Sequence, residues 1–363
     1  MTDEQAMQRT LVLALRGSGH VSPNPRVGCV ITKHGRVIAE GWHRAYGSLH
    51  AESDAIERAT ESVEGATLYV NLEPCAHQGK QPPCASLIIE KKLRRVVIGM
   101  EDPFHKVQGR GIAMLREAGI EVELGVLAEE CAWANRAFTK YTTTGLPYIV
   151  AKTAQTLDGC IATSRGESQW ITGEESRRRV HILRAELDAV LIGKSTAQTD
   201  NPTLDVRMVE GRNPKRIVFD TKLGLPLEIK LFSGADRANT IIVCDRKYTS
   251  TRKARNLAEA GVEVVGVETE NERIAEKEAL AVLAAEHNIT SILLEGGGRL
   301  TSSFFDKRLI DEFHFFIAPN IMGGGKHIFE NVGVNRLSNM PRFSVKFTAH
   351  SGDDLHVIAV YKS

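Results

Sequence analysis

The sequence has no block of like charge and no long apolar run. Its 46 lysines and arginines are nearly balanced by 45 aspartates and glutamates, so the formal net charge is +1 at pH 7. The chain therefore lacks the electrostatic footprint that nucleic acids and anionic membrane surfaces select. No apolar stretch approaches the ~20 residues with which a helix crosses a bilayer. These absences predict no nucleic-acid partner and no membrane partner, and they favour small-molecule ligands.

Cysteine is scarce, and no secretory signal accompanies it. Six cysteines are scattered over 363 residues, whereas a disulfide framework is typical of short secreted chains. The first residues, MTDEQAMQRTLVLALRG, have helix-like apolar spacing. Acidic residues lead this stretch and no small-residue cleavage site follows it, which argues against a signal peptide. We therefore expect reduced thiols and a cytoplasmic protein.

Length and composition predict two domains. The chain exceeds the usual size of one domain, and its 42% apolar and 25% charged residues are typical of a globular protein. The stretch TTTGLP, residues 142–147, is small and turn-forming, and it separates a helical pattern from the strand pattern PYIVAKTA. We place the boundary there, which gives domains over 1–145 and 146–363.

Both parts alternate helix and strand patterns, as α/β domains do. In the first part we expect a hairpin folded at His34-Gly35, strands TLYVNL and RRVVIGM, and helices over 5–15, 50–60, from about Ala85, after the second strand, and over 127–140. In the second part we expect helices over 174–187, 252–260 and 272–287, and strands PYIVAKTA, DAVLIG, KRIVFD and NTIIVCD. SILLEGGGRL then joins a strand to a helix, and DEFHFFIAPNIMGGG contains a last strand.

Two cysteines flank a short polar turn in NLEPCAHQGKQPPCASLI, and a histidine precedes them. We expect His50 to open one helix, Pro74-Cys75 to open another, and Cys84 to lie at the start of a third. One imidazole and two thiolates suit tetrahedral zinc, and three protein ligands leave a fourth position for water, as in catalytic sites. The alternatives are a closed structural clip, with His77 as a fourth ligand, and inert buried thiols.

Glu52 follows the candidate ligand His50 by two residues. Zinc lowers the pKa of a bound water enough to give hydroxide near neutral pH. If hydroxide attacks an aromatic carbon that bears an amino group, a proton must still move to a ring nitrogen and to the leaving ammonia. A carboxylate two residues after the ligand can reach that water without binding the metal, as in zinc nucleobase deaminases. A solvent-exposed helical glutamate is the alternative for Glu52.

HAE at 50–52, followed by EPCAHQGKQPPC at 73–84, resembles the cytidine-deaminase superfamily. With SPNPRVGCVI at 22–31, and with KTAQTLDGCIA, GESQWITG, STAQTDNPTLDVR, LLEGGGRL and DEFHFFIAPNIMGG further on, nearly the whole chain resembles the bifunctional deaminase/reductases of riboflavin biosynthesis. The resemblance implies an N-terminal cytidine-deaminase-like three-layer domain and a C-terminal dihydrofolate-reductase-like domain. It implies that His50, Cys75 and Cys84 bind Zn²⁺ and that Glu52 transfers protons.

The implied first reaction is hydrolytic deamination of 2,5-diamino-6-(5-phosphoribosylamino)pyrimidin-4(3H)-one to 5-amino-6-(5-phosphoribosylamino)uracil. Asn24, in the rigid SPNP turn, has an amide that can read a pyrimidine edge, although Asn is also an ordinary turn residue. His77 and Lys80 are candidates for binding phosphate or ribose, or are solvated loop residues. The chain departs from the family pattern at Gln81, where threonine is usual, and at Phe104-His105, where the loop is usually DPNP-like.

The strongest unaided signal in the second half is ILLEGGGRL, in which a strand ends at Glu295 and three glycines lead into a helix. Glycine lets a ligand approach the backbone, and free N–H groups at a helix start favour phosphate. A tight turn is the simpler interpretation, because the pattern is not G-x-G-x-x-G. MGGGK at 322–326 has the same two interpretations.

The resemblance implies that the second domain uses NADPH to reduce the ribosyl group to ribityl, with the cofactor carrying the hydride. The residues implied to touch substrate are Ser168, Arg184, Leu204, Arg207 and Glu295. Those implied to touch the cofactor are Ala154, Trp170, Thr196, Asp200, Gly297 and Gly298. Arginine forks suit the substrate phosphate, although helix-face or strand-end arginines are the plain alternative. Lys152 either bonds a sugar hydroxyl or faces solvent, and no proton donor for the reduction is assigned.

Two other functions compete with this reading. The first domain can be a deaminase of RNA or of free cytidine, against which stand the balanced charge and the attached reductase. It can instead be a zinc-stapled binding module without catalysis, against which stands Glu52. The resemblance also implies a homodimer or a higher homo-oligomer, assembled through the reductase domain.

Overall fold

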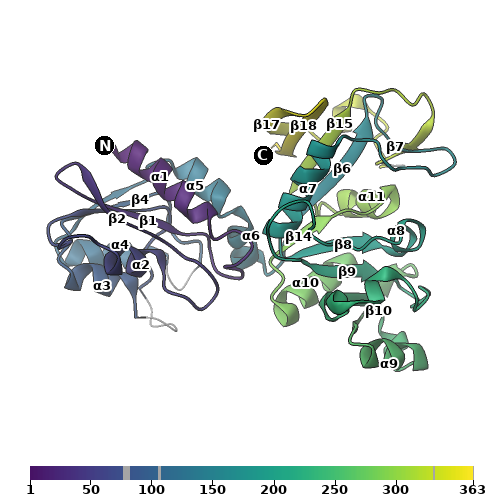
Figure 1. The fold of residues 1–363 in the computed structure, drawn as a ribbon, viewed down its shortest axis with the longest axis horizontal. Coiled ribbons are helices and arrows are strands. Elements are labelled where there is room, and N and C mark those ends of the chain that lie inside the picture. The colour runs from purple at the N-terminus through teal and green to yellow at the C-terminus, as the bar shows by residue number, and fades with distance from the viewer. Residues whose placement is uncertain (77–81, 105–107, 330–331, 363) are drawn as a thin grey trace. The chain divides into compact units, whose positions relative to one another are not determined.

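The computed structural model describes residues 1–76, 82–104, 108–329 and 332–362. The chain forms two compact units, Met1–Gly145 and Leu146–Ser363 (Figure 1). Within the described ranges, every helix is too short or too polar to span a membrane.

The first unit is built on a five-stranded sheet of order β2-β1-β3-β4-β5. Its strands are β1 (Gly28–Lys33), β2 (Arg36–Trp42), β3 (Thr67–Val70), β4 (Arg95–Ile98) and β5 (Glu121–Leu124). β1 runs antiparallel to β2 and β3, whereas β3, β4 and β5 are parallel. The hairpin turns at His34 and Gly35, whose positive φ angles suit a tight two-residue turn.

Helices cover both faces of this sheet. They are α1 (Asp3–Leu15), α2 (Ala51–Glu57), α3 (Cys84–Glu90), α4 (Arg110–Glu117), α5 (Ala128–Ala134) and α6 (Arg136–Thr144). On one face, Ile88 of α3 and Leu115 of α4 pack in a core with Leu68 of β3. On the other, Met7 of α1 packs with Tyr69. Because neighbouring residues of β3 point to opposite faces, the strand contributes to both cores, and the predicted three-layer architecture is confirmed.

The single helix expected over 127–140 is wrong, because two helices meet at Asn135. The Asn135 side chain accepts the Arg26 N–H at 2.8 Å and donates to the Arg26 carbonyl at 3.1 Å. Asn135 is 2% exposed, so its amide must find partners inside the protein. Binding the backbone of Arg26 satisfies the amide and breaks the helix at this residue.

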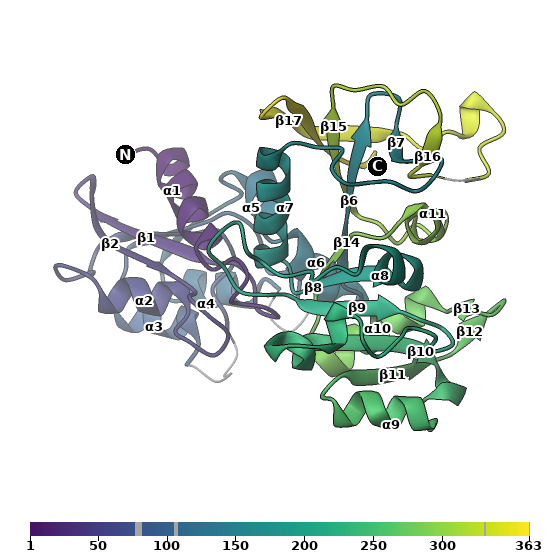
Figure 2. The same ribbon diagram turned by 45° about the vertical axis from the view of Figure 1, so that its right-hand side comes forward.

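The second unit is built on a nine-stranded sheet of order β11-β10-β9-β8-β14-β6-β15-β18-β17. Its strands are β6 (Tyr148–Thr156), β8 (Ala189–Gly193), β9 (Lys215–Phe219), β10 (Thr240–Asp245), β11 (Glu263–Val267), β14 (Ser291–Leu294), β15 (Glu312–Ala318), β17 (Phe343–Ser351) and β18 (Asp354–Tyr361). All pairs from β11 to β15 are parallel, and β18 is antiparallel to β15 and β17. Figure 2 shows β11 near one end of the unit and β17 near the other.

Two short pairs of strands complete the unit. They are β7 (Cys160–Thr163) with β16 (Gly325–His327), and β12 (Thr269–Glu270) with β13 (Arg273–Ile274). The helices are α7 (Glu174–Glu186), α8 (Lys194–Asp200), α9 (Arg252–Glu259), α10 (Glu276–His287) and α11 (Gly298–Asp306), with 3₁₀ turns at Lys230–Phe232, Ala235–Asn239, Arg246–Tyr248 and Leu337–Asn339.

Helices lie on both faces of the nine-stranded sheet. On one face, Phe313 of β15 packs against Phe305 of α11. The next residue of β15, His314, points to the opposite face and bonds His356 at 3.0 Å, beside Arg179 of α7. A parallel sheet covered on both faces and extended by an antiparallel pair agrees with the predicted dihydrofolate-reductase-like class.

The helix expected over 272–287 begins instead at Glu276. Asn271 and Glu272 both have positive φ angles, near 49° and 58°, and form the turn between β12 and β13. Two left-handed residues in succession are typical of a hairpin turn and incompatible with a helix. The helix-like pattern of the sequence therefore begins at residue 272, four residues before the helix itself.

Candidate active sites

His50, Cys75 and Cys84 come together in the first unit. The His50 Nδ1 atom lies 3.6 Å from Cys75 Sγ and 3.4 Å from Cys84 Sγ. Tetrahedral zinc with its usual bonds to sulfur and nitrogen separates its ligand atoms by roughly 3.5 to 3.8 Å, so both distances from His50 are close to those of ligands that share one ion. Within the described ranges, no other His, Cys, Asp or Glu joins the group.

Two of the three candidate ligands lie at the start of a helix. His50 is the N-cap of α2, and Cys84 is the first residue of α3, after Pro83. The helix expected to open at Pro74-Cys75 is wrong, because residues 73–76 have no regular secondary structure. The start of α3 reaches back to this segment: the Cys84 N–H donates to Cys75 Sγ at 3.3 Å, and the Ala85 N–H donates to the Cys75 carbonyl at 3.2 Å.

Glu73 anchors the segment that carries Cys75. It is 3% exposed, and its carboxylate accepts the N–H groups of Asp102, Gly109, Gly111 and Ile112 at 2.9 to 3.2 Å. Free amides at the start of α4 favour a carboxylate for the same reason that they favour other anions. The sequence analysis missed this role, because the four amides lie 29 to 39 residues further along the chain.

The electrostatics of the cluster suit a metal. Hydrogen bonds from Cys84 and His50 lower the pKa of Cys75 to about 4, so a thiolate is available as a ligand. Cys84 is fully buried, and the hydrogen bond to Cys75 raises the pKa of its thiol. A cation at the centre would favour deprotonation of both thiols.

Glu52 lies beside the cluster and is 4% exposed. Burial, followed by the charge of Cys75, raises the pKa of Glu52 to about 7, and the carboxylate is hydrogen-bonded to Cys84. It does not belong to the group of ligand atoms. A carboxyl group with a pKa near neutrality, next to a candidate metal position, can accept and return a proton.

Asn24 is held by a histidine that the sequence analysis did not consider. The Asn24 Nδ2 atom lies 3.1 Å from His43 Nε2, and His43 Nδ1 lies 2.9 Å from the Leu49 carbonyl. The carbonyl can only accept, so Nδ1 carries the ring proton and Nε2 accepts from the Asn24 amide. The ring of His43 meets that of His50 edge-on, with centroids 5.6 Å apart. Asn24 is therefore fixed close to the cluster.

Some predicted residues of the first domain lie outside the described residues. These are His77, Lys80, Gln81 and His105. Phe104 is described, and its N–H donates to the Asp102 carboxylate at 2.8 Å.

The second unit contains a cavity of about 1110 Å³. All the substrate-binding and cofactor-binding residues predicted for this half of the chain line it: Ala154, Ser168, Trp170, Arg184, Thr196, Asp200, Leu204, Arg207, Glu295, Gly297 and Gly298. They come from several elements at the carboxyl ends of β6, β8 and β14, the usual position of ligand sites in open α/β sheets.

A cluster of buried charges lies in the cavity. Arg184 donates from Nε and Nη2 to the two Glu295 carboxylate oxygens at 2.6 and 3.0 Å, and Lys152 Nζ lies 3.8 Å from Glu295. Although burial opposes it, the charges of Arg184 and Lys152 lower the pKa of Glu295 to about 2. Burial lowers the pKa of Lys152, whereas Glu295 opposes that shift. Lys152 thus lines the cavity, with its side chain 20% exposed, and its contact with a sugar hydroxyl stays a prediction.

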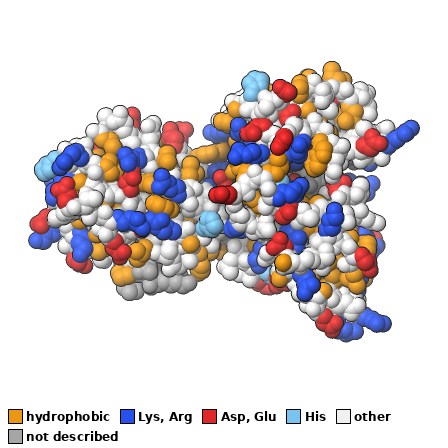
Figure 3. Space-filling model, viewed as in Figure 1, with side chains coloured by type: hydrophobic (Ala, Val, Ile, Leu, Met, Phe, Trp, Pro, Cys, Tyr) orange, Lys and Arg blue, Asp and Glu red, His pale blue; other side chains and the backbone are white. Residues whose placement is uncertain are grey.

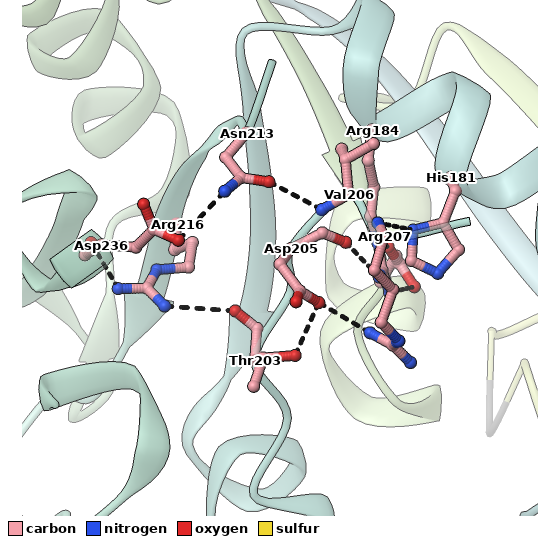
Figure 4. Close-up of polar contacts among 10 residues, drawn as sticks. His181, Arg184, Thr203, Asp205, Val206, Arg207, Asn213, Arg216 and Asp236 are labelled. Carbon is pink, nitrogen blue, oxygen red and sulfur yellow. Dashed lines mark hydrogen bonds and ion pairs between the residues drawn. The ribbon is translucent and has the colours of Figure 1, made fainter. Parts of the chain in front are cut away.

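A loop after α8 carries Leu204 and Arg207. Figure 4 shows Arg207 with Thr203, Asp205 and Val206 of this loop. Arg216 of β9, 5% exposed, fastens the loop by donating to the Thr203 carbonyl at 3.2 Å. Asp205 accepts a hydrogen bond from Arg207 Nη1 at 2.6 Å, and its carbonyl accepts from Arg184 Nη1 at 3.1 Å. The loop therefore holds both arginines on one side of the cavity.

The other predicted contacts lie at glycine backbone and helix ends. Gly297 is the N-cap of α11, and a Cβ atom there would lie 3.5 Å from the Thr196 hydroxyl of α8. Asp200 is the last residue of α8, and burial raises its pKa. Trp170 is 64% exposed, with the Arg177 guanidinium 4.8 Å from its ring, so it is not a core residue. The backbone N–H groups at the start of α11 lie at this cavity, and such groups suit a phosphate.

Charges of both signs are interspersed over the surface that Figure 3 shows. On each unit, lysine and arginine side chains alternate with aspartate and glutamate side chains. This face has no broad patch of a single sign, in agreement with the net charge of +1.

Comparisons with known proteins cover both units. Residues 147–357 match the family described as "RibD C-terminal domain", and residues 1–100 match "Cytidine and deoxycytidylate deaminase zinc-binding region". The chain is 40% identical over 357 residues to the riboflavin biosynthesis protein RibD of Actinobacillus pleuropneumoniae, covering 98% of this chain and 94% of that one. It is 36% identical to the Escherichia coli RibD, covering 99% and 100%.

Solved structures agree with these relatives. Acinetobacter baumannii RibD, 34% identical, superposes with a TM-score of 0.89 over 99% of both chains. A diaminohydroxyphosphoribosylaminopyrimidine deaminase/5-amino-6-(5-phosphoribosylamino)uracil reductase from Thermotoga maritima is 38% identical, with a TM-score of 0.88 over 99% of both chains.

Proposed function

Because this chain belongs to the RibD family of bifunctional riboflavin biosynthesis proteins, we propose that its two sites catalyse successive steps on one phosphoribosylaminopyrimidine. The first unit deaminates 2,5-diamino-6-(5-phosphoribosylamino)pyrimidin-4(3H)-one, and the second reduces the ribosyl chain of the resulting uracil. The observation that carries the proposal is the fit of His50, Cys75 and Cys84 to one zinc ion beside the buried carboxyl group of Glu52.

In the first site, His50, Cys75 and Cys84 would hold zinc, which when bound lowers the pKa of a water ligand. Glu52 takes one proton from the attacking water and delivers it to a ring nitrogen. It then moves the second proton of that water to the departing amino group, which leaves as ammonia. A buried carboxyl group beside the metal position can act as both acceptor and donor. Asn24, fixed by His43, contributes a free amide oxygen that can accept a hydrogen bond from the pyrimidine.

In the second site we propose NADPH, which when bound supplies the hydride. Ala154, Trp170, Thr196, Asp200, Gly297 and Gly298 are the proposed cofactor contacts. Ser168, Leu204, Arg184, Arg207 and Glu295 are the proposed substrate contacts. Reduction gives carbon 1 of the sugar a hydride and the attached nitrogen a proton. Burial lowers the pKa of Lys152, and its Nζ lies 3.8 Å from Glu295. We propose that Lys152 exchanges that proton.

Incubation of the zinc-loaded chain with the diaminopyrimidinone phosphate tests the proposal. Without NADPH we expect one equivalent of ammonia and a product in which oxygen replaces the amino group. With NADPH we expect a second product that has gained two hydrogens, at a higher rate than with NADH. Mass spectrometry identifies both. If cytidine or transfer RNA releases ammonia and the diaminopyrimidinone phosphate does not, the deaminase assignment is contradicted.

We further propose a homodimer in which β17 of one copy lies against β17 of a second. β17 is an edge strand of nine residues that pairs on one side with β18. Val345 and Phe347 in its middle are 60% and 42% exposed, and Leu337 and Met340 just before it are 83% and 51% exposed. A long apolar edge is a template for pairing with another chain, and a two-fold axis satisfies both copies at once.

Light scattering after size exclusion checks this proposal. We expect the wild-type chain to elute with the mass of two copies, and Val345→Lys combined with Phe347→Lys to elute with the mass of one. Val12→Lys, at a residue of α1 that is 59% exposed, is the matched control and should leave the mass unchanged. A monomeric wild type at micromolar concentration would refute the dimer.

We also propose a cytoplasmic location, since all six cysteines are free, as thiols are in a reducing compartment.

A further inference from the structure

A histidine that belongs to none of the motifs discussed above lies in the cavity of the second unit. His181, on α7, lines the cavity and is 3% exposed. It lies three residues before Arg184, so the two side chains share one face of the helix. Figure 4 shows its ring next to Arg207. His181 is therefore a buried polar group beside two arginines.

One hydrogen bond fixes the tautomer of His181. The backbone N–H of Arg207 donates to His181 Nδ1 at 3.3 Å. Since Nδ1 must accept, the proton of the neutral ring is on Nε2. Burial, followed by the charges of Arg184 and Arg207, lowers the pKa of His181 to about 4, which keeps the ring neutral at physiological pH. Within the part of the chain that the structure describes, Nε2 has no hydrogen-bond partner.

The surrounding groups favour a negatively charged ligand for this N–H. Arg184 commits Nε and Nη2 to Glu295 and Nη1 to the Asp205 carbonyl. Arg207 commits Nη1 to the Asp205 carboxylate, and its side chain is 51% exposed and able to turn toward a ligand. The Nε2–H group is open to the cavity that His181 lines, so a ligand there can accept from it beside the two arginines. An anion in the cavity can accept from Nε2 and from Arg207, while Arg184, already paired with Glu295, adds its positive charge to the site.

We propose that His181 is a substrate-binding residue of the reductase site, donating from Nε2 to the phosphate that Arg184 and Arg207 also bind. The proposal rests on the reductase function proposed above and adds a phosphate contact that no sequence motif indicated.

Two substitutions separate the two nitrogen atoms. In His181→Asn the amide oxygen can take the place of Nδ1 and keep the Arg207 N–H, but no donor reaches the Nε2 position. In His181→Gln the amide nitrogen can take the place of Nε2 and keep the donor. A hydrogen bond to a charged group contributes about 1.5 to 3 kcal/mol, which corresponds to about 10- to 100-fold in binding.

The measurements are the KM for the phosphorylated substrate, the KM for its dephosphorylated analogue, and the Kd for inorganic phosphate by calorimetry. We expect His181→Asn to raise the KM for the phosphorylated substrate and the Kd for inorganic phosphate by about 10- to 100-fold. Its kcat and its KM for the dephosphorylated analogue should stay within about threefold of wild type. His181→Gln should stay within about threefold of wild type in all of them. Ammonia release by the first unit of the same chain reports that each variant is folded.

Three outcomes would overturn the proposal. If His181→Gln is impaired and His181→Asn is not, His181 acts only by positioning Arg207. If neither variant changes phosphate binding, His181 does not contact the phosphate. If both variants lose both substrates equally, its role is structural. Calorimetry with inorganic phosphate needs no turnover, so it tests His181 even without reductase activity. Failure of the reductase assignment itself would be seen separately, as no reduction by the wild type.

Discussion

Glu52→Gln is expected to lower kcat for ammonia release by about 10³-fold while the chain keeps one zinc ion. The amide has the size of the carboxyl group but cannot carry a proton from water to the pyrimidine and on to ammonia. His50, Cys75 and Cys84 are unchanged, and their ligand atoms lie within 4.8 Å of one another without any contribution from Glu52. Ammonia assays and metal analysis of the purified variant measure the two quantities separately.

The matched control for this variant is Glu57→Gln, the same exchange on the same helix at an exposed position. Its ammonia release should equal that of wild type. Reduction of the deaminated substrate by the second unit should be unaffected in both variants. If Glu52→Gln retains ammonia release with zinc bound, another group moves the proton and the catalytic assignment of Glu52 is wrong.

Glu295→Gln is expected to lower kcat/KM of the reduction by about 10²-fold or more. The carboxylate is the common partner of Arg184 and Lys152, both of which are largely buried. Removing one partner of a buried ion pair leaves charge without compensation, at a cost of about 3 to 5 kcal/mol. If displacement of Arg184 costs about 3 kcal/mol of transition-state stabilisation, kcat/KM falls by about 100-fold, because each 1.4 kcal/mol is roughly a factor of ten. Steady-state kinetics with the deaminated substrate measure the loss.

A second buried glutamate of the same unit tells a local effect from general destabilisation. Glu276 is 4% exposed, pairs with Lys307 at 2.6 Å, and does not line the cavity. Glu276→Gln should lower the melting temperature of the second unit but leave kcat/KM of the folded enzyme unchanged. Equal losses of activity in Glu276→Gln and Glu295→Gln would mean that Glu295 acts through stability alone.

The deaminase site was predictable because its chemistry is written in short motifs. His50 and Glu52 are two residues apart, Cys75 and Cys84 are nine apart, and each stands at the beginning of an element or in a tight segment. The relation of Glu52 to His50 survives folding because they are two residues apart, whereas the approach of His50 to the two cysteines depends on the fold. The path of the chain around Cys75 was not predictable. The expected helix is absent there, and the neighbouring Glu73 carboxylate accepts the distant N–H groups of Gly109 and Gly111.

The reductase site was predictable only through resemblance. Arg184, Arg207 and Glu295 are separately ordinary residues of a helix, a loop and a strand end, and nothing local distinguishes them. Lys152 and His181 carried no usable signal, because each contacts a residue far along the chain: Glu295 lies 143 residues after Lys152, and Arg207 lies 26 residues after His181.

The sequence by itself determined the alternation of helices and strands and indicated three candidate zinc donors with a glutamate near them, because apolar periodicity and motif spacing act over a few residues. Tertiary structure alone decided where α5 ends, which nitrogen of His181 carries its proton, and that Lys152, Arg184 and Glu295 share one buried cluster. Burial strengthens electrostatic interactions and makes an unpaired polar group costly, so these features depend on neighbours that only the folded chain supplies.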